Sequence, residues 1–154
     1  MKYLDPIHLV AAKRSPLGRF GGGLKSLSAV EIARQVTKQA LELSMIEATQ
    51  LTVGGQVVQA GCGMNPARQL ALAAGVNQDA PAYTVNMVCG SGLQAVAEVA
   101  DAIALGNISS GLALGMESMS RAPFLSADTR WGDRYGDATL SDALQSDGLT
   151  FGNQ

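Results

Sequence analysis

The chain has 154 residues, of which 47% are hydrophobic, and it carries a formal net charge of −2. This length is enough for about one domain with a sizeable core, and the scattered charges exclude the basic surface of a nucleic-acid-binding protein. No apolar run approaches the roughly 18 residues of a membrane span. Two cysteines without metal-ligand spacing, and no secretory signal, predict a protein of the reducing cytoplasm with no bound metal.

The N-terminal third predicts a strand, a loop and a helix. Residues 7–12 are apolar and predict a first strand, in which the only histidine, His8, has a structural role. The glycines within residues 18–23 lack the Gly-Lys-Ser/Thr ending of a phosphate-binding loop, so a flexible loop is the better interpretation. Ser28 and Glu31 have the spacing of a capping box, and the apolar residues behind them predict an amphipathic helix.

A second strand and a second helix follow. The strand is expected over residues 53–59. Asn65 is placed to cap the helix, with Pro66 in its first turn and Gly75 just beyond its end. Arg68, on this helix, either helps to order a site or a subunit contact, or has a structural or solvated role.

The most informative segment places a cysteine between a strand and a helix. Residues 82–86 predict a third strand, and apolar residues at helical spacing from Leu93 to Ala104 predict a helix that stops at Gly106. Cys89 therefore lies where unpaired N–H groups and the positive end of the helix dipole favour a thiolate, the nucleophilic form. The alternative is a buried structural cysteine, but the strand–turn–helix context favours a nucleophile.

A fourth strand at residues 112–116 completes an alternation of strands and helices. This alternation predicts the α/β class, with a mostly parallel sheet flanked by helices. From residue 117 onward, polar and turn-forming residues dominate. We therefore expect an α/β domain over residues 1–119 and the beginning of a poorly packed loop region over residues 120–154.

Several short motifs in this chain match one enzyme family. Residues 86–93, NMVCGSGL, resemble the nucleophile motif of the thiolases, the family of acetyl-CoA acetyltransferases and 3-ketoacyl-CoA thiolases. Other segments resemble thiolase motifs in the same order: RSPLG at 14–18, GQVVQAG at 55–61, NPARQ at 65–69, GMESMS at 115–120 and DGLT at 147–150. The resemblance covers nearly the whole chain, and several motifs in register are more specific than any one of them.

The resemblance implies a fold and a reaction. Residues 1–119 would form an incomplete first-half thiolase domain with strand order 3-2-1-4-5, lacking its fifth strand. The reaction would be reversible Claisen condensation or thiolysis of acyl-CoA in fatty acid metabolism. Cys89 would be the nucleophile and its backbone N–H an oxyanion-hole donor, and Leu149 would bind substrate. Coenzyme A would be a substrate, no cofactor is implied, and relatives of this kind form homo-oligomers.

The sequence departs from the thiolase pattern in what it lacks. The family's late GHP histidine motif and its second cysteine motif, C-x-G, are absent from these 154 residues. Cys62 lies where the family is variable and is interpreted as a free thiol in a turn, not as the second catalytic cysteine. We therefore expect the chain alone to be inactive and to need a complementing C-terminal thiolase half. One alternative is an inactive truncated remnant or interaction subunit. Another is a β-ketoacyl synthase, but the GMESMS and NPARQ motifs count against it.

Overall fold

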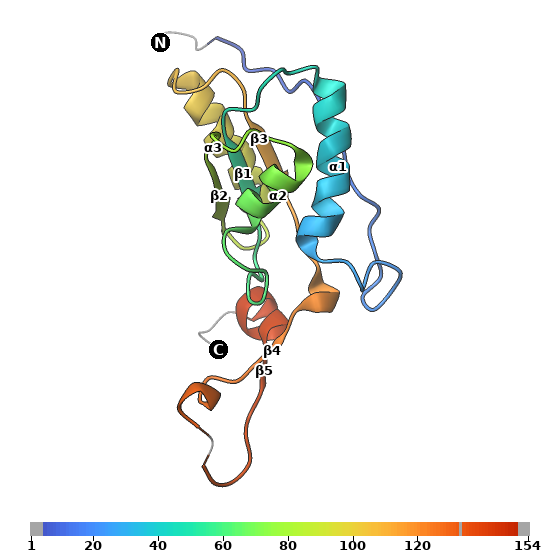
Figure 1. Cartoon of the computed structure of the whole chain (residues 1–154), viewed down its shortest axis with the longest axis vertical. Helices are drawn as coiled ribbons and strands as arrows, with labels where there is room; N and C mark the ends of the chain where they lie inside the picture. The colour runs from blue at the N-terminus through green and yellow to red at the C-terminus, as the bar shows by residue number, and fades with distance from the viewer. Residues whose placement is uncertain (1–4, 133, 151–154) are drawn as a thin grey trace.

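A computed structural model describes residues 5–132 and 134–150 of the chain (Figure 1). Its larger part is an α/β body with three layers. Two helices, α1 (Ala29–Ser44) and α2 (Pro66–Ala74), cover one face of a parallel sheet, and α3 (Ser91–Ala104) covers the other. The α/β class and the parallel sheet flanked by helices are as predicted.

The sheet of this body has β1 (Thr52–Gly55) at its centre, between β2 (Ala82–Val85) and β3 (Leu112–Gly115). Both neighbours run parallel to β1, and Thr52 lies opposite Ala82 and Leu112. The carboxyl ends of all three strands therefore lie at one edge of the sheet, which is where ligands and catalytic groups gather in open α/β sheets.

The core is divided between the two faces of the sheet. Val53, which is fully buried, packs with Leu51, Ala95 and Val99 beneath α3. On the other face, buried side chains of α2 pack with α1 and with the segment that follows α2, chiefly Ala29, Ala33, Leu70, Ala71, Val76 and Ala80. Most of these side chains are small, so the helices approach the sheet closely.

The helix boundaries agree with the sequence signals. Ser28 and Glu31 form both hydrogen bonds of a capping box at the start of α1. Asn65 caps α2 by accepting from the Arg68 N–H, and Gly75 ends that helix with a φ of 93°, in the left-handed region that favours glycine. The capping predictions for both helices are confirmed.

The prediction for the first strand is wrong. Residues 7–12 form no strand, and His8, Leu9 and Val10 are exposed. The expected 3-2-1-4-5 order is wrong as well, because β1, the predicted second strand, pairs directly with β3, the predicted fourth. An apolar pattern shows that a segment suits a sheet but not which strand it pairs with, and both edges of β1 are occupied. β1 also ends at Gly55, four residues before the predicted end.

Beyond the body, the chain becomes irregular. A short η1 (Met119–Arg121) leads into β4 (Phe124–Leu125), which pairs antiparallel with β5 (Ser141–Asp142). The long loop between β4 and β5, described apart from residue 133, contains η2 (Thr129–Trp131) and extends away from the body (Figure 1). The π-helix η3 (Leu144–Leu149) then returns toward the carboxyl edge of the sheet. A domain boundary at residue 119 stays a prediction.

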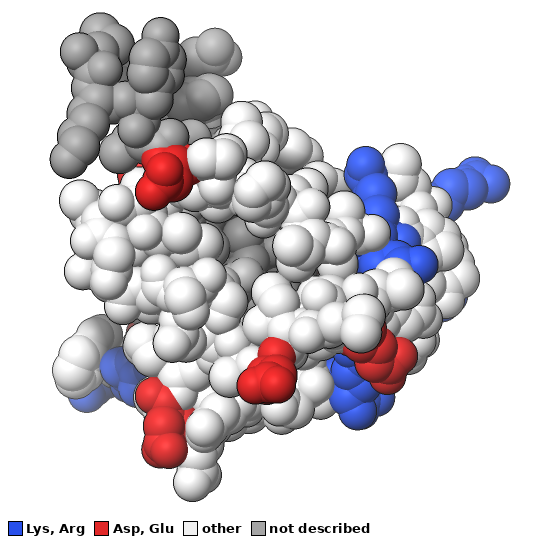
Figure 2. Space-filling view, turned by 90° about the horizontal axis from the view of Figure 1, so that it is seen from above, with Lys and Arg blue, Asp and Glu red and all other residues white. Residues whose placement is uncertain are grey.

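Figure 2 shows acidic and basic side chains dispersed over the face it views, without one continuous basic patch. Among the described residues, no helix is long and apolar enough to cross a membrane. The same residues contain no group of three or more His, Cys, Asp or Glu side chains arranged to hold a metal ion.

Candidate active site

Three connections meet at the carboxyl edge of the sheet. The ladder continues one residue past the strands, because the Gln56 N–H donates to Val85 O (3.1 Å) and the Met116 N–H donates to Gly55 O (2.9 Å). The segments after β1, β2 and β3 are thereby held side by side. Cys89 lies in the second of them, three residues after Asn86.

The turn that carries Cys89 is tight and strained. Val88 has a φ of 49°, a left-handed conformation that a β-branched residue rarely adopts. Its N–H donates to Asn86 Oδ1 (3.0 Å), and its carbonyl accepts from both the Ser91 hydroxyl (2.6 Å) and the Ser91 N–H (3.1 Å). The Ser91 hydroxyl also accepts from the Met87 N–H (2.8 Å). Cys89 itself is exposed and is not in a disulfide, so the strand–turn–helix prediction is confirmed and the buried alternative is not.

Glycines bring the start of α3 directly onto the sheet. A Cβ at Gly55 would lie 2.4 Å from the Ser91 carbonyl carbon and 2.7 Å from the Gly92 nitrogen. Gly92 in turn faces Gly115 of β3, where a Cβ would lie 3.2 Å from the Gly92 Cα. Only glycine permits such an approach of backbone to backbone. The N-terminus of α3, and with it the position of Cys89, is therefore fixed by the ends of β1 and β3.

A carboxylate from the end of β3 holds the connection after β1. Glu117 Oε2 accepts from the Val57 N–H (2.9 Å) and the Val58 N–H (3.3 Å). Burial raises the pKa of the Glu117 carboxyl, against the lowering effect of these two donors. The Asn86 side chain joins the same connection to the nucleophile turn by donating to Val57 O (3.3 Å). The sequence interpretation assigned no role to Glu117 or Asn86, although both lie inside the motifs GMESMS and NMVCGSGL.

Comparison with known proteins identifies the family. Residues 7–153 match the family model described as "Thiolase, N-terminal domain". The chain belongs to the thiolase family. It is 43% identical over 149 residues to a probable acetyl-CoA acyltransferase of Staphylococcus epidermidis and 45% identical over 148 residues to an acetyl-CoA acetyltransferase of Cupriavidus necator. The family prediction is confirmed.

A solved thiolase has the same fold. The crystal structure of the Acat5 thiolase from Ascaris suum in complex with coenzyme A is 40% identical in sequence, with a TM-score of 0.86 over 90% of this chain. The matches to the two bacterial relatives include 95–96% of this chain. The chain nevertheless spans only 38% of the length of each of these relatives and 36% of the Ascaris chain. What the whole relatives catalyse therefore applies to this chain only as a proposal.

The structure also places the other residues considered from the thiolase pattern. Cys62 is a free, half-buried thiol in a turn, as predicted, and its sulfur accepts from Gln56 Nε2 (3.2 Å). Arg68 has the structural role, because its guanidinium donates to Ala80 O (2.6 Å) and Gln78 O (2.5 Å) and closes the loop before β2. Neither of these two hydrogen bonds joins Arg68 to the Cys89 turn.

Leu149 lies at the end of η3 and is exposed. Its neighbour Gly148 approaches the connection after β1, since a Cβ there would lie 3.2 Å from Val58 Cγ2. Helix η3 thus packs near the segment that Glu117 holds, at the same edge of the sheet as Cys89. A substrate-binding role for Leu149 stays a prediction.

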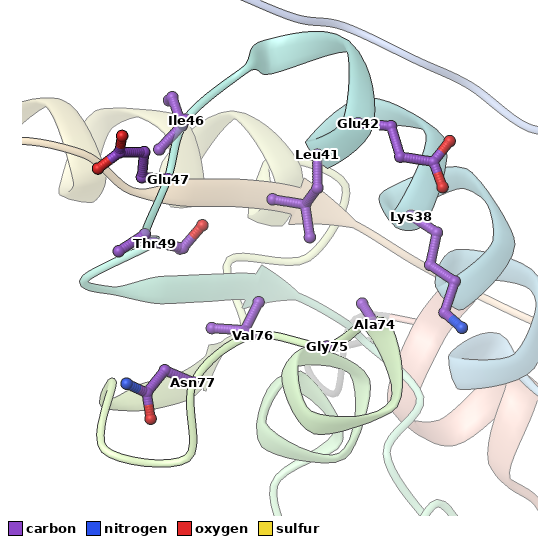
Figure 3. A pocket seen from close by; sticks show the side chains of 11 residues that line it. Lys38, Leu41, Glu42, Ile46, Glu47, Thr49, Ala74, Gly75, Val76 and Asn77 are labelled. Atoms are coloured by element: carbon purple, nitrogen blue, oxygen red, sulfur yellow. The ribbon is translucent and has the colours of Figure 1, made fainter.

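A hollow in the α/β body lies away from the Cys89 turn. It measures about 510 Å³ and lies between the ends of α1 and α2 and the segment before β1 (Figure 3). Its lining includes Leu41, Ile46, Thr49, Val76 and Asn77. These residues precede β1 and β2 or end the helices, so the hollow is at the amino edge of the sheet, whereas Cys89 follows the carboxyl edge. This hollow therefore does not mark the candidate site.

Proposed function

We propose that this chain supplies the nucleophile of a thiolase-type acyltransferase, with Cys89 forming an acyl-thioester intermediate. The observation that supports the proposal is the position of Cys89, exposed on a strained turn immediately before α3. Strained backbone held by several hydrogen bonds is typical of functional sites.

In the first half-reaction, the Cys89 sulfur attacks the carbonyl carbon of an acyl-CoA thioester. The bond between that carbon and the sulfur of coenzyme A breaks, and coenzyme A leaves as a thiol after taking up a proton. The acyl group stays on Cys89, which gives ping-pong kinetics. The backbone N–H of Cys89 stabilises the negative charge that develops on the carbonyl oxygen.

The second half-reaction needs groups beyond these 154 residues. A base must remove an α-proton from a second acyl-CoA before carbon–carbon bond formation. The histidine and second-cysteine motifs that thiolases use are not in the sequence, so we assign them to a complementing C-terminal half. Acyl-CoA and coenzyme A are the proposed substrates, supported by the coenzyme A in the Ascaris suum thiolase structure. The cytoplasm is the proposed location, and no separate cofactor is proposed.

Acyl capture tests the first half-reaction directly. The purified chain would be incubated with acetyl-CoA, and its intact mass and peptide map would be measured. We expect a mass gain of one acetyl group, located on Cys89, unchanged in Cys62→Ala and abolished in Cys89→Ala. Acetylation of Cys62 instead, or no acetylation of a folded chain under any acyl-CoA concentration tested, would contradict the assignment.

The alternative is a thiolase-like interaction subunit without catalysis. It is favoured by large apolar side chains that the described structure leaves exposed. Among them are Leu93 on α3 and Trp131 and Tyr135 in the long loop between β4 and β5. A chain that binds a partner through these surfaces but never captures an acyl group, alone or in the complex, would support this alternative.

A further inference from the structure

The connection after β1 is clamped from two sides. Glu117, after β3, accepts from the N–H groups of Val57 and Val58 at 2.9 and 3.3 Å. From the other side, the buried Gln56 donates through Nε2 to Val58 O at 3.1 Å. A carboxylate that accepts two backbone N–H groups forms a stronger clamp than a neutral acceptor would.

The clamped connection is joined to the nucleophile turn by one side chain. Asn86 Nδ2 donates to Val57 O (3.3 Å), and Asn86 Oδ1 accepts from the Val88 N–H (3.0 Å). Val88 immediately precedes Cys89. An unbroken path of hydrogen bonds therefore leads from the Glu117 carboxylate through residues 57–58 and Asn86 to the turn.

The end of this path is the residue that most needs support. Val88 has a φ of 49°, and a β-branched residue keeps such a conformation only where the surrounding contacts over-determine it. Ser91 holds the Val88 carbonyl, but the Val88 N–H is held by Asn86. Asn86 is exposed, so its orientation depends on its own partners, one of which belongs to the segment that Glu117 clamps.

We propose that Glu117 is a positioning residue for Cys89, acting through residues 57–58 and Asn86. The proposal rests on the proposed function in that Cys89 is the nucleophile. When the carboxylate is removed, the connection after β1 loosens, Asn86 loses a fixed acceptor, and Val88 relaxes toward a negative φ. Cys89 then leaves its place before α3 and reacts more slowly with electrophiles.

The test uses alkylation of Cys89 by iodoacetamide in the 154-residue chain, followed by peptide mapping. We expect Glu117→Gln to slow Cys89 alkylation by about tenfold, the order of one lost hydrogen bond to a charged group. Asn86→Ala, which loses hydrogen bonds between neutral groups, should slow it by about fivefold. The double variant should be no slower than the slower single variant, because both changes break one path. The matched control is Glu98→Gln, which removes a carboxylate that binds the Tyr83 hydroxyl outside this path; its alkylation rate should equal that of the wild type.

Amide hydrogen exchange separates positioning from a general loss of stability. The Val88 N–H should exchange faster in Glu117→Gln and in Asn86→Ala, while protection within α1 stays at the wild-type level. Faster alkylation of Cys89 in Glu117→Gln would overturn the proposal, because it would mean that the carboxylate acts only by its charge. Effects of Glu117→Gln and Asn86→Ala that add in the double variant would also overturn it.

Three further outcomes are decisive. If Glu117→Gln does not fold, Asn86→Ala alone carries the test, and an unchanged alkylation rate in that variant overturns the proposal. If wild-type Cys89 captures acyl groups but Glu117→Gln reacts equally fast, the positioning role fails and the proposed function stands. If wild-type Cys89 is no more reactive than Cys62, the proposed function itself fails.

Discussion

Replacing Gly55 by alanine tests whether the end of β1 positions the nucleophile. The new Cβ would lie 2.4 Å from the Ser91 carbonyl carbon and 2.5 Å from the Ser91 oxygen, whereas ordinary contacts begin at 3.4 Å. Every atom in the way belongs to the backbone of α3, so no side chain can rotate aside. The start of α3 must therefore retreat from the sheet by about 1 Å.

This retreat has two expected consequences. Overpacking of this kind lowers the free energy of unfolding by about 1–3 kcal/mol. Because residues 86–90 span the fixed end of β2 and the start of α3, the displacement is absorbed around Cys89. If Cys89 loses its place at the helix N-terminus, it loses an interaction free energy of about 1 kcal/mol. We therefore expect its alkylation to be roughly fivefold slower than in the wild type.

Gly54→Ala is the matched control, because Gly54 is the preceding residue of the same strand and is equally buried. Its Cβ would lie 2.8 Å from Ala67 Cβ, so it presses on α2 at the opposite face. Urea unfolding and timed iodoacetamide labelling of both variants give the comparison. Both should be destabilised, but only Gly55→Ala should slow Cys89. Equal labelling rates in the two variants, or a Gly55→Ala chain as stable as wild type, would refute the reasoning.

Three other outcomes are expected. Limiting iodoacetamide should label Cys89 ahead of the half-buried Cys62, and preferential labelling of Cys62 in folded protein would contradict the site. The chain alone should show no thiolase turnover, with some activity restored by a C-terminal half in trans; robust acetoacetyl-CoA cleavage that disappears in Cys89→Ala would overturn this. The chain should self-associate along the edge strand β2, and Thr84→Pro, which removes one edge N–H, should weaken pairing in light scattering. Because the Thr84 hydroxyl also accepts from the Ala67 N–H, Thr84→Val is the control, and a monomeric wild type at micromolar concentration would refute the contact.

Local signals predicted the local structure of this chain well. The capping box at Ser28, the Asn65 cap and the strand–turn–helix around Cys89 each depend on residues close in sequence, and each is found. The partner of a strand depends on residues far away, and there the prediction for residues 7–12 failed. Glu117 was missed for the same reason: it acts on Val57 and Val58, some sixty residues earlier, and no spacing rule indicates such a contact.

The cost of keeping a carboxylate at this position is measurable through pH. Burial raises the pKa of Glu117 in the folded chain, so between the unfolded and folded pKa values the folded chain binds more protons than the unfolded chain. Its contribution to stability is therefore fully present below the unfolded pKa and is lost as pH rises through the folded pKa. Glu117→Gln lacks this titration, and all other groups are common to both chains. The stability of the variant relative to wild type should accordingly rise as pH increases from about 4, the ordinary carboxyl range, and then level off, as measured by urea unfolding at each pH. A relative stability that instead falls with pH would show that the Val57 and Val58 donors outweigh burial. In that case the carboxylate would stabilise the fold at neutral pH, and its presence on the connection after β1 would need no functional explanation.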